Sequence, residues 1–183
     1  MGNVKEILKR LEEANEKKYM FNIKPDAGRL LHVLVKIKRP KNIVEVGTAN
    51  GYSAILIASA LKNAKVYTIE LNPAKAKEAR ANFKEAGLKN ITLLEGNALT
   101  VLKKFNTKVD MVFLDATKKE YLKYLRLLEK NMNDCCVVIA DNVISHNEKV
   151  GEYLKYVHKN YTSITLHVGS GVELSVKTSP FLL

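Results

Sequence analysis

The sequence IVEVGTANGYS, residues 43–53, joins a short apolar run to a helical segment through a loop that contains two glycines. The run up to Val46 is rich in β-branched residues and predicts a buried strand, and Tyr52 opens the next helix. Gly47 allows the backbone to approach a ligand closely, and Gly51 relieves crowding where the helix begins. A strand, a glycine loop and a helix in this order predict the first unit of an α/β sheet.

The loop is suited to a small anion. The free N–H groups at the helix N-terminus and the Ser53 hydroxyl can bind an anionic group. Two glycines do not make the three-glycine GxGxxG pattern of dinucleotide-binding loops, so a pyrophosphate fits poorly. A carboxylate, such as that of a bound amino acid, fits better.

Short apolar runs and helical segments alternate along the rest of the chain. Runs that are apolar throughout are typical of strands buried on both faces, so we predict a doubly wound, mostly parallel α/β sheet of seven strands. Two strands in the tail, Ser163–Val168 and Val172–Lys177, are separated by only three residues and must form an antiparallel hairpin. The other predicted strands are Asn42–Val46, Lys65–Glu70, Ile91–Leu94, Val109–Leu114 and Cys135–Ala140. The predicted helices are Met1–Lys18, one that follows Pro25, Tyr52–Leu61, Pro73–Ala86, Ala98–Lys103, Lys118–Asn131 and Asn147–Asn160.

The length of 183 residues suits one α/β domain. We expect a single domain over residues 1–183, with N-terminal helices in residues 1–38 covering the ligand site and the core in residues 39–183. No apolar run approaches the ~18 residues that span a bilayer, and the lysine- and glutamate-rich N-terminus argues against a secretory signal. We therefore expect a cytoplasmic protein with no membrane partner.

The cysteine content and the net charge bear on whether the protein has a disulfide, a zinc site or a nucleic-acid partner. Cys135 and Cys136 are adjacent, which disfavours a disulfide, and no zinc-ligand spacing surrounds them, so we expect two small residues in a buried strand. The formal net charge of +11 can attract nucleic acid or an acidic substrate. The basic residues are scattered through every predicted helix, however, which favours a solvated, lysine-rich surface of the kind found in thermophilic proteins.

Polar residues that end the second and third strands predict a nucleoside site. In an open α/β sheet the ligand lies beyond the carboxyl ends of the strands. Glu70 follows Gly47 by 23 residues and is placed to accept hydrogen bonds from both ribose hydroxyls, although it could instead be an exposed strand-end charge or a cap for the helix at Pro73. After the third strand, Gly96 permits close approach, and Asn97 either caps the next helix or faces an adenine.

Acidic and amide side chains end the fourth and fifth strands. Asp115 follows one, and Asp141 with Asn142 follows the other, so all three are expected at the same sheet edge as Gly47. Each alone could be a helix cap. Two carboxylates and an amide carbonyl together form an oxygen-rich site suited to Mg²⁺ rather than zinc.

The sequence resembles the cation-dependent O-methyltransferases of the catechol and caffeoyl-CoA type. The resemblance runs from about Pro25 to Lys177, and its most specific part pairs an Asp-x-x-Lys segment with a later Asp-Asn. It implies the Rossmann-like fold of class I methyltransferases and S-adenosylmethionine as the cofactor. The matching segments are EVGTANGYS (45–53), YTIE (67–70), FLDATKKEY (113–121), ADN (140–142) and the hairpin GSGVEL (169–174).

The resemblance also implies roles for single residues. Lys118 lies at the position of the lysine that acts as general base in the catechol enzymes, and Asp115 is the other implied catalytic residue. The implied ligands of a divalent cation are Asp115, Asp141 and Asn142. The implied cofactor-binding residues are Glu45, Gly47, Gly51, Ser53, Glu70, Gly96, Asn97, Ala98 and Asp115.

The chain departs from the family pattern at two places. Cys135-Cys136 stands where relatives usually have glycines, which concerns packing more than function. The segment Val143–Asn147 runs almost directly into a helix, where relatives have a longer substrate loop. We therefore expect a short acceptor wall and an acceptor that is larger or more exposed than a catechol.

Three functions are consistent with these patterns. The leading one is a divalent-cation-assisted O-methyltransferase that methylates a hydroxyl of a small phenolic or vicinal-diol acceptor. The second is a tRNA-modifying methyltransferase with the same site, motivated by the net charge. The third is a non-catalytic nucleotide-binding protein, against which the intact Asp and Lys residues count. A homodimer is one assembly to expect, as in short microbial relatives.

Overall fold

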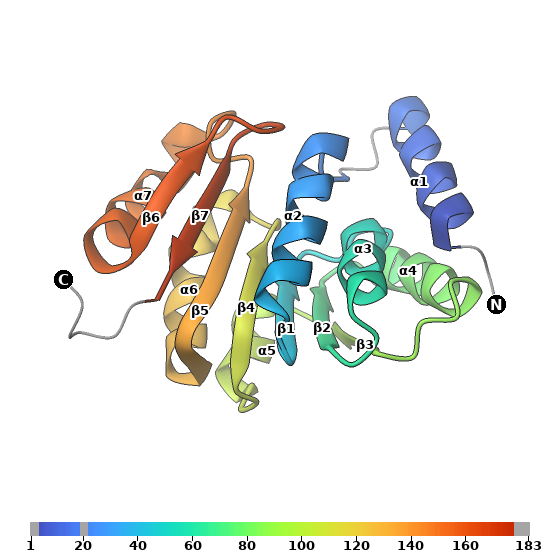
Figure 1. Cartoon of the computed structure of the whole chain (residues 1–183), viewed down its shortest axis with the longest axis horizontal. Helices are drawn as coiled ribbons and strands as arrows, with labels where there is room; N and C mark the ends of the chain where they lie inside the picture. The colour runs from blue at the N-terminus through green and yellow to red at the C-terminus, as the bar shows by residue number, and fades with distance from the viewer. Residues whose placement is uncertain (1–3, 19–21, 178–183) are drawn as a thin grey trace.

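A seven-stranded sheet with helices on both faces forms the centre of the protein (Figure 1). The computed structural model describes residues 4–18 and 22–177, with the backbone alone for residues 15–18. The strands are β1 (Asn42–Val46), β2 (Lys65–Glu70), β3 (Ile91–Glu95), β4 (Val109–Leu114), β5 (Met132–Asp141), β6 (Thr162–Leu166) and β7 (Val172–Val176). The α-helices are α1 (Val4–Lys18), α2 (Pro25–Lys38), α3 (Tyr52–Ala60), α4 (Pro73–Glu85), α5 (Ala98–Lys104), α6 (Tyr121–Leu128) and α7 (Asn147–Asn160).

The strand order is β3-β2-β1-β4-β5-β7-β6. Strands β1 to β5 pair in parallel, and β7 pairs antiparallel with both β5 and β6. The predicted doubly wound sheet with a closing hairpin is therefore confirmed. The order reverses between β1 and β4, which creates a switch point where a ligand can lie beyond the strand ends.

Two apolar clusters fill the space between the sheet and its helices. On one face, Leu31 of α2 and Ile55 of α3 pack against Ile43 and Met111 of the sheet. On the other face, Leu102 of α5, Leu125 of α6 and Val157 of α7 belong to the cluster that includes Val112 and Val138. Because both faces are covered, the central strands are apolar almost throughout.

Some local expectations differ from the structure. β5 begins at Met132, and its register against β4 shifts between Val109 and Met111, so that Cys135 lies in an irregular stretch with a left-handed φ of 58°. Cys135 is exposed and only Cys136 is buried, although both are free thiols as expected.

The predicted helix over 118–131 consists of a 3₁₀ turn (Lys118–Glu120), α6 and a second 3₁₀ turn (Glu129–Asn131). Such turns are frequent at helix ends. The edge strand β3 is buried only at Leu93, not on both faces. None of the helices in the described segments has the length and apolar character that crossing a bilayer requires.

Candidate active site

A cleft of about 910 Å³ lies beyond the carboxyl ends of the parallel strands. Loops after β1, β2, β3, β4 and β5 all contribute to it, so the sheet edge brings together residues that are distant in the sequence. Glu45, Gly51 and Asp141 do not line the cleft, although each adjoins a residue that does. The other predicted site residues line it: Gly47, Ser53, Glu70, Gly96, Asn97, Ala98, Asp115, Lys118 and Asn142.

The two glycines of the β1–α3 loop serve different purposes. Gly47 has a φ of +106°, and a Cβ there would lie 2.2 Å from the carbonyl oxygen of Asp115. A side chain would therefore push apart the ends of β1 and β4. Gly51 has a φ of +90°, and its Cβ would lie 2.5 Å from the ring of Phe83 in α4. The geometry thus gives Gly51 a packing role, and its contact with a cofactor stays a prediction.

Glu70 is fixed to the same loop by two backbone amides. Its Oε2 accepts a hydrogen bond from Ala49 N at 2.8 Å, and its Oε1 accepts one from Asn72 N at 2.8 Å. The cap of α4 is Asn72, whose Oδ1 accepts from Ala74 N at 2.9 Å, so Glu70 does not cap this helix. Each carboxylate oxygen keeps a lone pair for a ligand hydroxyl.

Beyond β3, Gly96 and Asn97 enter the cleft from the start of α5. Gly96 has a φ of +132°, which glycine adopts without strain. Asn97 caps α5, because its Oδ1 accepts a hydrogen bond from Leu99 N at 2.9 Å. The capping alternative is thereby confirmed, and Asn97 still lines the cleft beside Ala98. Contact with an adenine stays a prediction for both.

Glu45 is buried directly behind the glycine loop. Its Oε2 accepts a hydrogen bond from Thr68 Oγ1, which also pairs with Thr48 Oγ1 at 2.6 Å, while Oε1 has no partner among the described residues. Burial raises the pKa of this carboxyl to about 7, and the hydroxyls of Ser53 and Thr68 only partly offset the effect.

Asp115 and Lys118 form an ion pair on the floor of the cleft. Lys118 Nζ lies 2.7 Å from Asp115 Oδ1, and the two side chains are only 13% and 12% exposed. The 3₁₀ turn that begins at Lys118 places the amine above the strand end, 5.3 Å from the ring centre of Tyr121. The predicted catalytic pair is therefore in direct contact.

Asp141 is the least satisfied polar group at this edge. Its side chain is buried, and both carboxylate oxygens have no hydrogen-bond partner within the described part of the chain. Burial, together with the nearby charge of Asp115, raises the pKa of the Asp141 carboxyl above its usual range. Tyr121 donates a hydrogen bond from its hydroxyl to the Asp141 carbonyl at 3.1 Å, which fixes the strand end.

The donor set at this edge fits a hard cation. A divalent ion would supply the positive charge that the two orphaned oxygens of Asp141 lack, and Asp115 and Asn142 offer further oxygen ligands at the cleft. No group of three or more His, Cys, Asp and Glu side chains is placed to hold a metal among residues 4–18 and 22–177. The set here has two carboxylates and an amide, which matches ions that keep several waters or substrate oxygens.

Some lining residues escaped sequence reasoning. Asn50, Lys119 and Lys149 line the cleft, and none of them was predicted to do so. His146 takes the N-cap position of α7 and also lines the cleft, with Nδ1 2.9 Å from Ser145 Oγ. Lys149 lies three residues after His146, a helical spacing that could have indicated a shared face.

Comparison with known proteins places the chain in a family. The profile described as O-methyltransferase matches residues 2–167. The chain belongs to the O-methyltransferase family. Its relatives include the catechol O-methyltransferase of Niastella koreensis, 33% identical over 138 residues that cover 72% of this chain and 62% of that protein. The mouse catechol O-methyltransferase is 29% identical over 94% of this chain and 68% of its own length. The chain thus spans about two thirds of the length of these relatives.

Solved O-methyltransferase structures superpose over nearly the whole chain. A putative O-methyltransferase from Klebsiella pneumoniae has a TM-score of 0.86 and 27% identity, covering 94% of this chain and 90% of that one. The O-methyltransferase TomG of Streptomyces achromogenes, in complex with SAM, also has a TM-score of 0.86, with 26% identity over 95% of this chain and 90% of its own.

Proposed function

We propose that this member of the O-methyltransferase family transfers a methyl group from S-adenosylmethionine to a hydroxyl of a small phenolic or vicinal-diol acceptor. The observation that carries the proposal is the single cleft that joins the glycine loop and Glu70 to Asp115, Lys118 and Asn142. A nucleoside-binding half and an oxygen-rich, charged half therefore open into one space.

The β1–β3 half of the cleft supports cofactor binding. Gly47 lines the cleft where β1 and β4 end side by side, Ser53 lies in the first turn of α3, and Glu70 faces the cleft between two backbone amides. The S. achromogenes enzyme was solved with SAM, and a Bacillus cereus O-methyltransferase with a TM-score of 0.83 and 25% identity was solved with SAH. When bound, the cofactor supplies an electrophilic methyl group on its sulfonium.

The β4–β5 half supports a divalent cation. Asp115, Asp141 and Asn142 are the residues that would hold it, and the unpartnered oxygens of Asp141 are the strongest reason to expect it. A bound Mg²⁺ would supply positive charge at the acceptor oxygens, which favours the ionised hydroxyl. The protein's own contribution is alignment, because an in-line displacement depends on the relative positions of the reacting atoms.

Lys118 is the group we propose to receive the hydroxyl proton. Its amine is held at the cleft by Asp115 Oδ1 at 2.7 Å, close to where a ligated acceptor would lie. To accept a proton Lys118 must be the neutral amine, so this role requires that its ion pair with Asp115 be broken first, as it would be if Asp115 held a cation. General-base help of this kind contributes typically about 10²–10⁴ in rate.

A larger acceptor is the second candidate. Lys119 and Lys149 line the cleft, and Ile144, in the segment before α7, is exposed. With the net charge of +11, these lysines are the reason to test an acceptor such as tRNA beside the small phenolic or vicinal-diol acceptor. A steep loss of tRNA binding with added salt would support this candidate, and binding that salt does not change would exclude it.

Methyl transfer from labelled S-adenosylmethionine decides among these functions. The purified protein is incubated with a catechol panel and, separately, with total tRNA, each with Mg²⁺ and with a chelator. Mg²⁺-dependent labelling of the catechols is expected. Label in tRNA alone would favour the second candidate. Cofactor binding without any transfer would indicate a non-catalytic binding protein, and no cofactor binding would refute the proposal.

A further inference from the structure

Asn50 is a buried residue of the cofactor loop whose side-chain amide is only half satisfied. It is 2% exposed and lines the cleft. Its Oδ1 accepts a hydrogen bond from Tyr52 N at 3.2 Å, which fixes the orientation of the amide because a backbone N–H can only donate. The other end, Nδ2, has no hydrogen-bond partner among the described residues. Two N–H donors are thus buried at the N-terminus of α3 without an acceptor.

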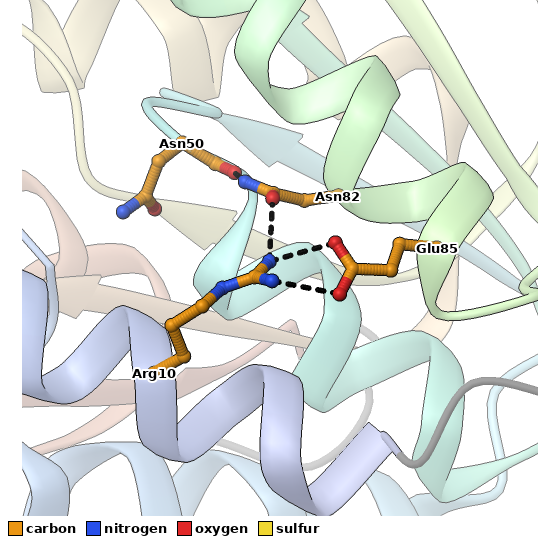
Figure 2. Close-up of polar contacts among 4 residues, drawn as sticks. All are labelled: Arg10, Asn50, Asn82 and Glu85. Atoms are coloured by element: carbon orange, nitrogen blue, oxygen red, sulfur yellow. Dashed lines mark hydrogen bonds and ion pairs between the residues drawn. The ribbon is translucent and has the colours of Figure 1, made fainter.

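A network from two helices fixes the backbone at this position (Figure 2). Asn82 of α4 donates from Nδ2 to the Asn50 carbonyl at 2.8 Å. Arg10 of α1 donates to Asn82 Oδ1 at 3.2 Å and makes two hydrogen bonds with Glu85, at 2.7 and 2.8 Å. Figure 2 shows the Asn50 side chain directed away from this network. Its free amide is therefore not needed to hold the helices together.

The hydrogen-bond donors near Asn50 Nδ2 determine which kind of ligand group can bind there. The amides of Ser53 and Ala54 in the first turn of α3 have no acceptor inside their helix, and the helix dipole adds partial positive charge there. Donors from a side chain and from a helix N-terminus together suit an anion of carboxylate size. A cationic ammonium group has no lone pair and would leave all of them without an acceptor, and a neutral acceptor would gain less from the helix dipole than a carboxylate does.

We propose that Asn50 Nδ2 donates a hydrogen bond to the carboxylate of the amino-acid moiety of the cofactor. This assignment rests on the proposed function, because it takes the bound ligand to be S-adenosylmethionine. It makes Asn50 a cofactor-binding residue, and it adds a charge-assisted hydrogen bond from a side chain to those that backbone amides at the start of α3 can donate. The bond acts on the amino-acid end of the cofactor and leaves the adenosine end untouched.

Two ligands allow binding at the amino-acid end to be measured separately from binding at the adenosine end. S-adenosylhomocysteine carries the amino-acid carboxylate, and 5′-methylthioadenosine has the same adenosine and sulfur without it. The variant Asn50→Asp keeps an oxygen for Tyr52 N and replaces the donor by a second oxygen. Isothermal titration should show that the variant loses at least fivefold more affinity for S-adenosylhomocysteine than for 5′-methylthioadenosine. A smaller difference would overturn the proposal.

A matched control comes from the adenosine end. Asn97 also lines the cleft, and Asn97→Asp keeps the cap of α5, so this variant should change the affinities for the two ligands by the same factor. Should Asn50→Asp not fold, as judged by its thermal melt, Asn50→Ser keeps a hydroxyl for Tyr52 N and should show the same selective loss by the same criterion. Failure of the wild-type protein to bind S-adenosylhomocysteine would refute the cofactor assignment together with the role of Asn50. Wild-type binding without selective loss would refute the role of Asn50 alone.

Discussion

The buried carboxyl of Glu45 makes the stability of the protein depend on pH, and Glu45→Gln should remove this dependence. Burial raises the pKa of Glu45 from 4.5 to about 7 in the folded chain. The folded state therefore keeps a proton that the unfolded state has already lost between these two pH values. Stability is highest below pH 4.5 for this group, falls as pH rises, and levels off above pH 7.

The size of the effect follows from the two pKa values. Each pKa unit corresponds to about 1.4 kcal/mol, so Glu45 costs the folded state about 2.5 kcal/mol between pH 5 and pH 8. Glutamine has the same shape and no charge. Its amide nitrogen would take the place of an unpartnered oxygen, at a cost of about 1–3 kcal/mol that does not vary with pH. The informative quantity is therefore the change in unfolding free energy between the two pH values, not the stability at either one.

Urea unfolding of the wild type and of Glu45→Gln at pH 5, 6, 7 and 8 measures this quantity. Other titrating groups, including Asp141, are common to both proteins and cancel in the comparison. The wild type should lose about 2.5 kcal/mol more than the variant over this range, equivalent to roughly 5–10 °C in Tm for a domain of this size. Glu78→Gln, at an exposed position of α4, is the control and should follow the wild type. Parallel pH profiles for the wild type and Glu45→Gln would refute the reasoning.

Three further predictions concern the cleft. Asp141→Ala should reduce methyl transfer at least ~100-fold while the Kd for S-adenosylhomocysteine changes little, and unaltered activity would refute the metal assignment. Gly47→Ala should lower the unfolding free energy by about 2–4 kcal/mol in urea, because its Cβ meets the Asp115 carbonyl, whereas Gly151→Ala, in open space on α7, should raise it by about 0.5–1 kcal/mol. Equal effects at the two glycines would contradict the packing seen here. Lys118→Gln should lower kcat by about 10²–10⁴ without weakening cofactor binding, and an unchanged kcat would assign the proton to another acceptor.

The fold was predictable because its signals are local and repeated. Apolar runs of five or six residues between helical segments defined β1, β2 and β4 to the residue, and the three-residue gap before Val172 required a hairpin. The start of β5 was missed because residues 132–135 are irregular in their pairing with β4, and no periodicity in the sequence marks such a shift. Cys135 is exposed for the same reason.

The residues that line the cleft were predictable where they stand directly at the end of a parallel strand. Gly47, Glu70 and Asp115 follow directly from the rule that ligands lie beyond the carboxyl ends of parallel strands. The sequence could not tell whether Asn97 caps a helix or lines the cleft, and the structure shows that it does both. Capping uses the carbonyl oxygen of the side chain and leaves the amide nitrogen for a ligand, so the two roles never excluded each other.

The sequence could not reveal which buried polar groups lack a hydrogen-bond partner. Glu45 Oε1, Asn50 Nδ2 and both oxygens of Asp141 are buried without partners in the described part of the chain. Glu45 lies in the last two residues of β1, Asn50 in the loop that follows β1, and Asp141 at the end of β5. Whether a buried polar side chain lacks a hydrogen-bond partner can be judged only from the three-dimensional structure. The sequence is the same whether the residue is paired or unpaired. Leaving such groups unpaired destabilises the folded chain, and the structure tolerates several of them close to one cleft. The Asn50 amide can pair with a ligand that carries a hydrogen-bond acceptor, and the Asp141 carboxylate can pair with a cation bound beside that ligand. Binding should therefore contribute to the stability of the fold as well as to the reaction.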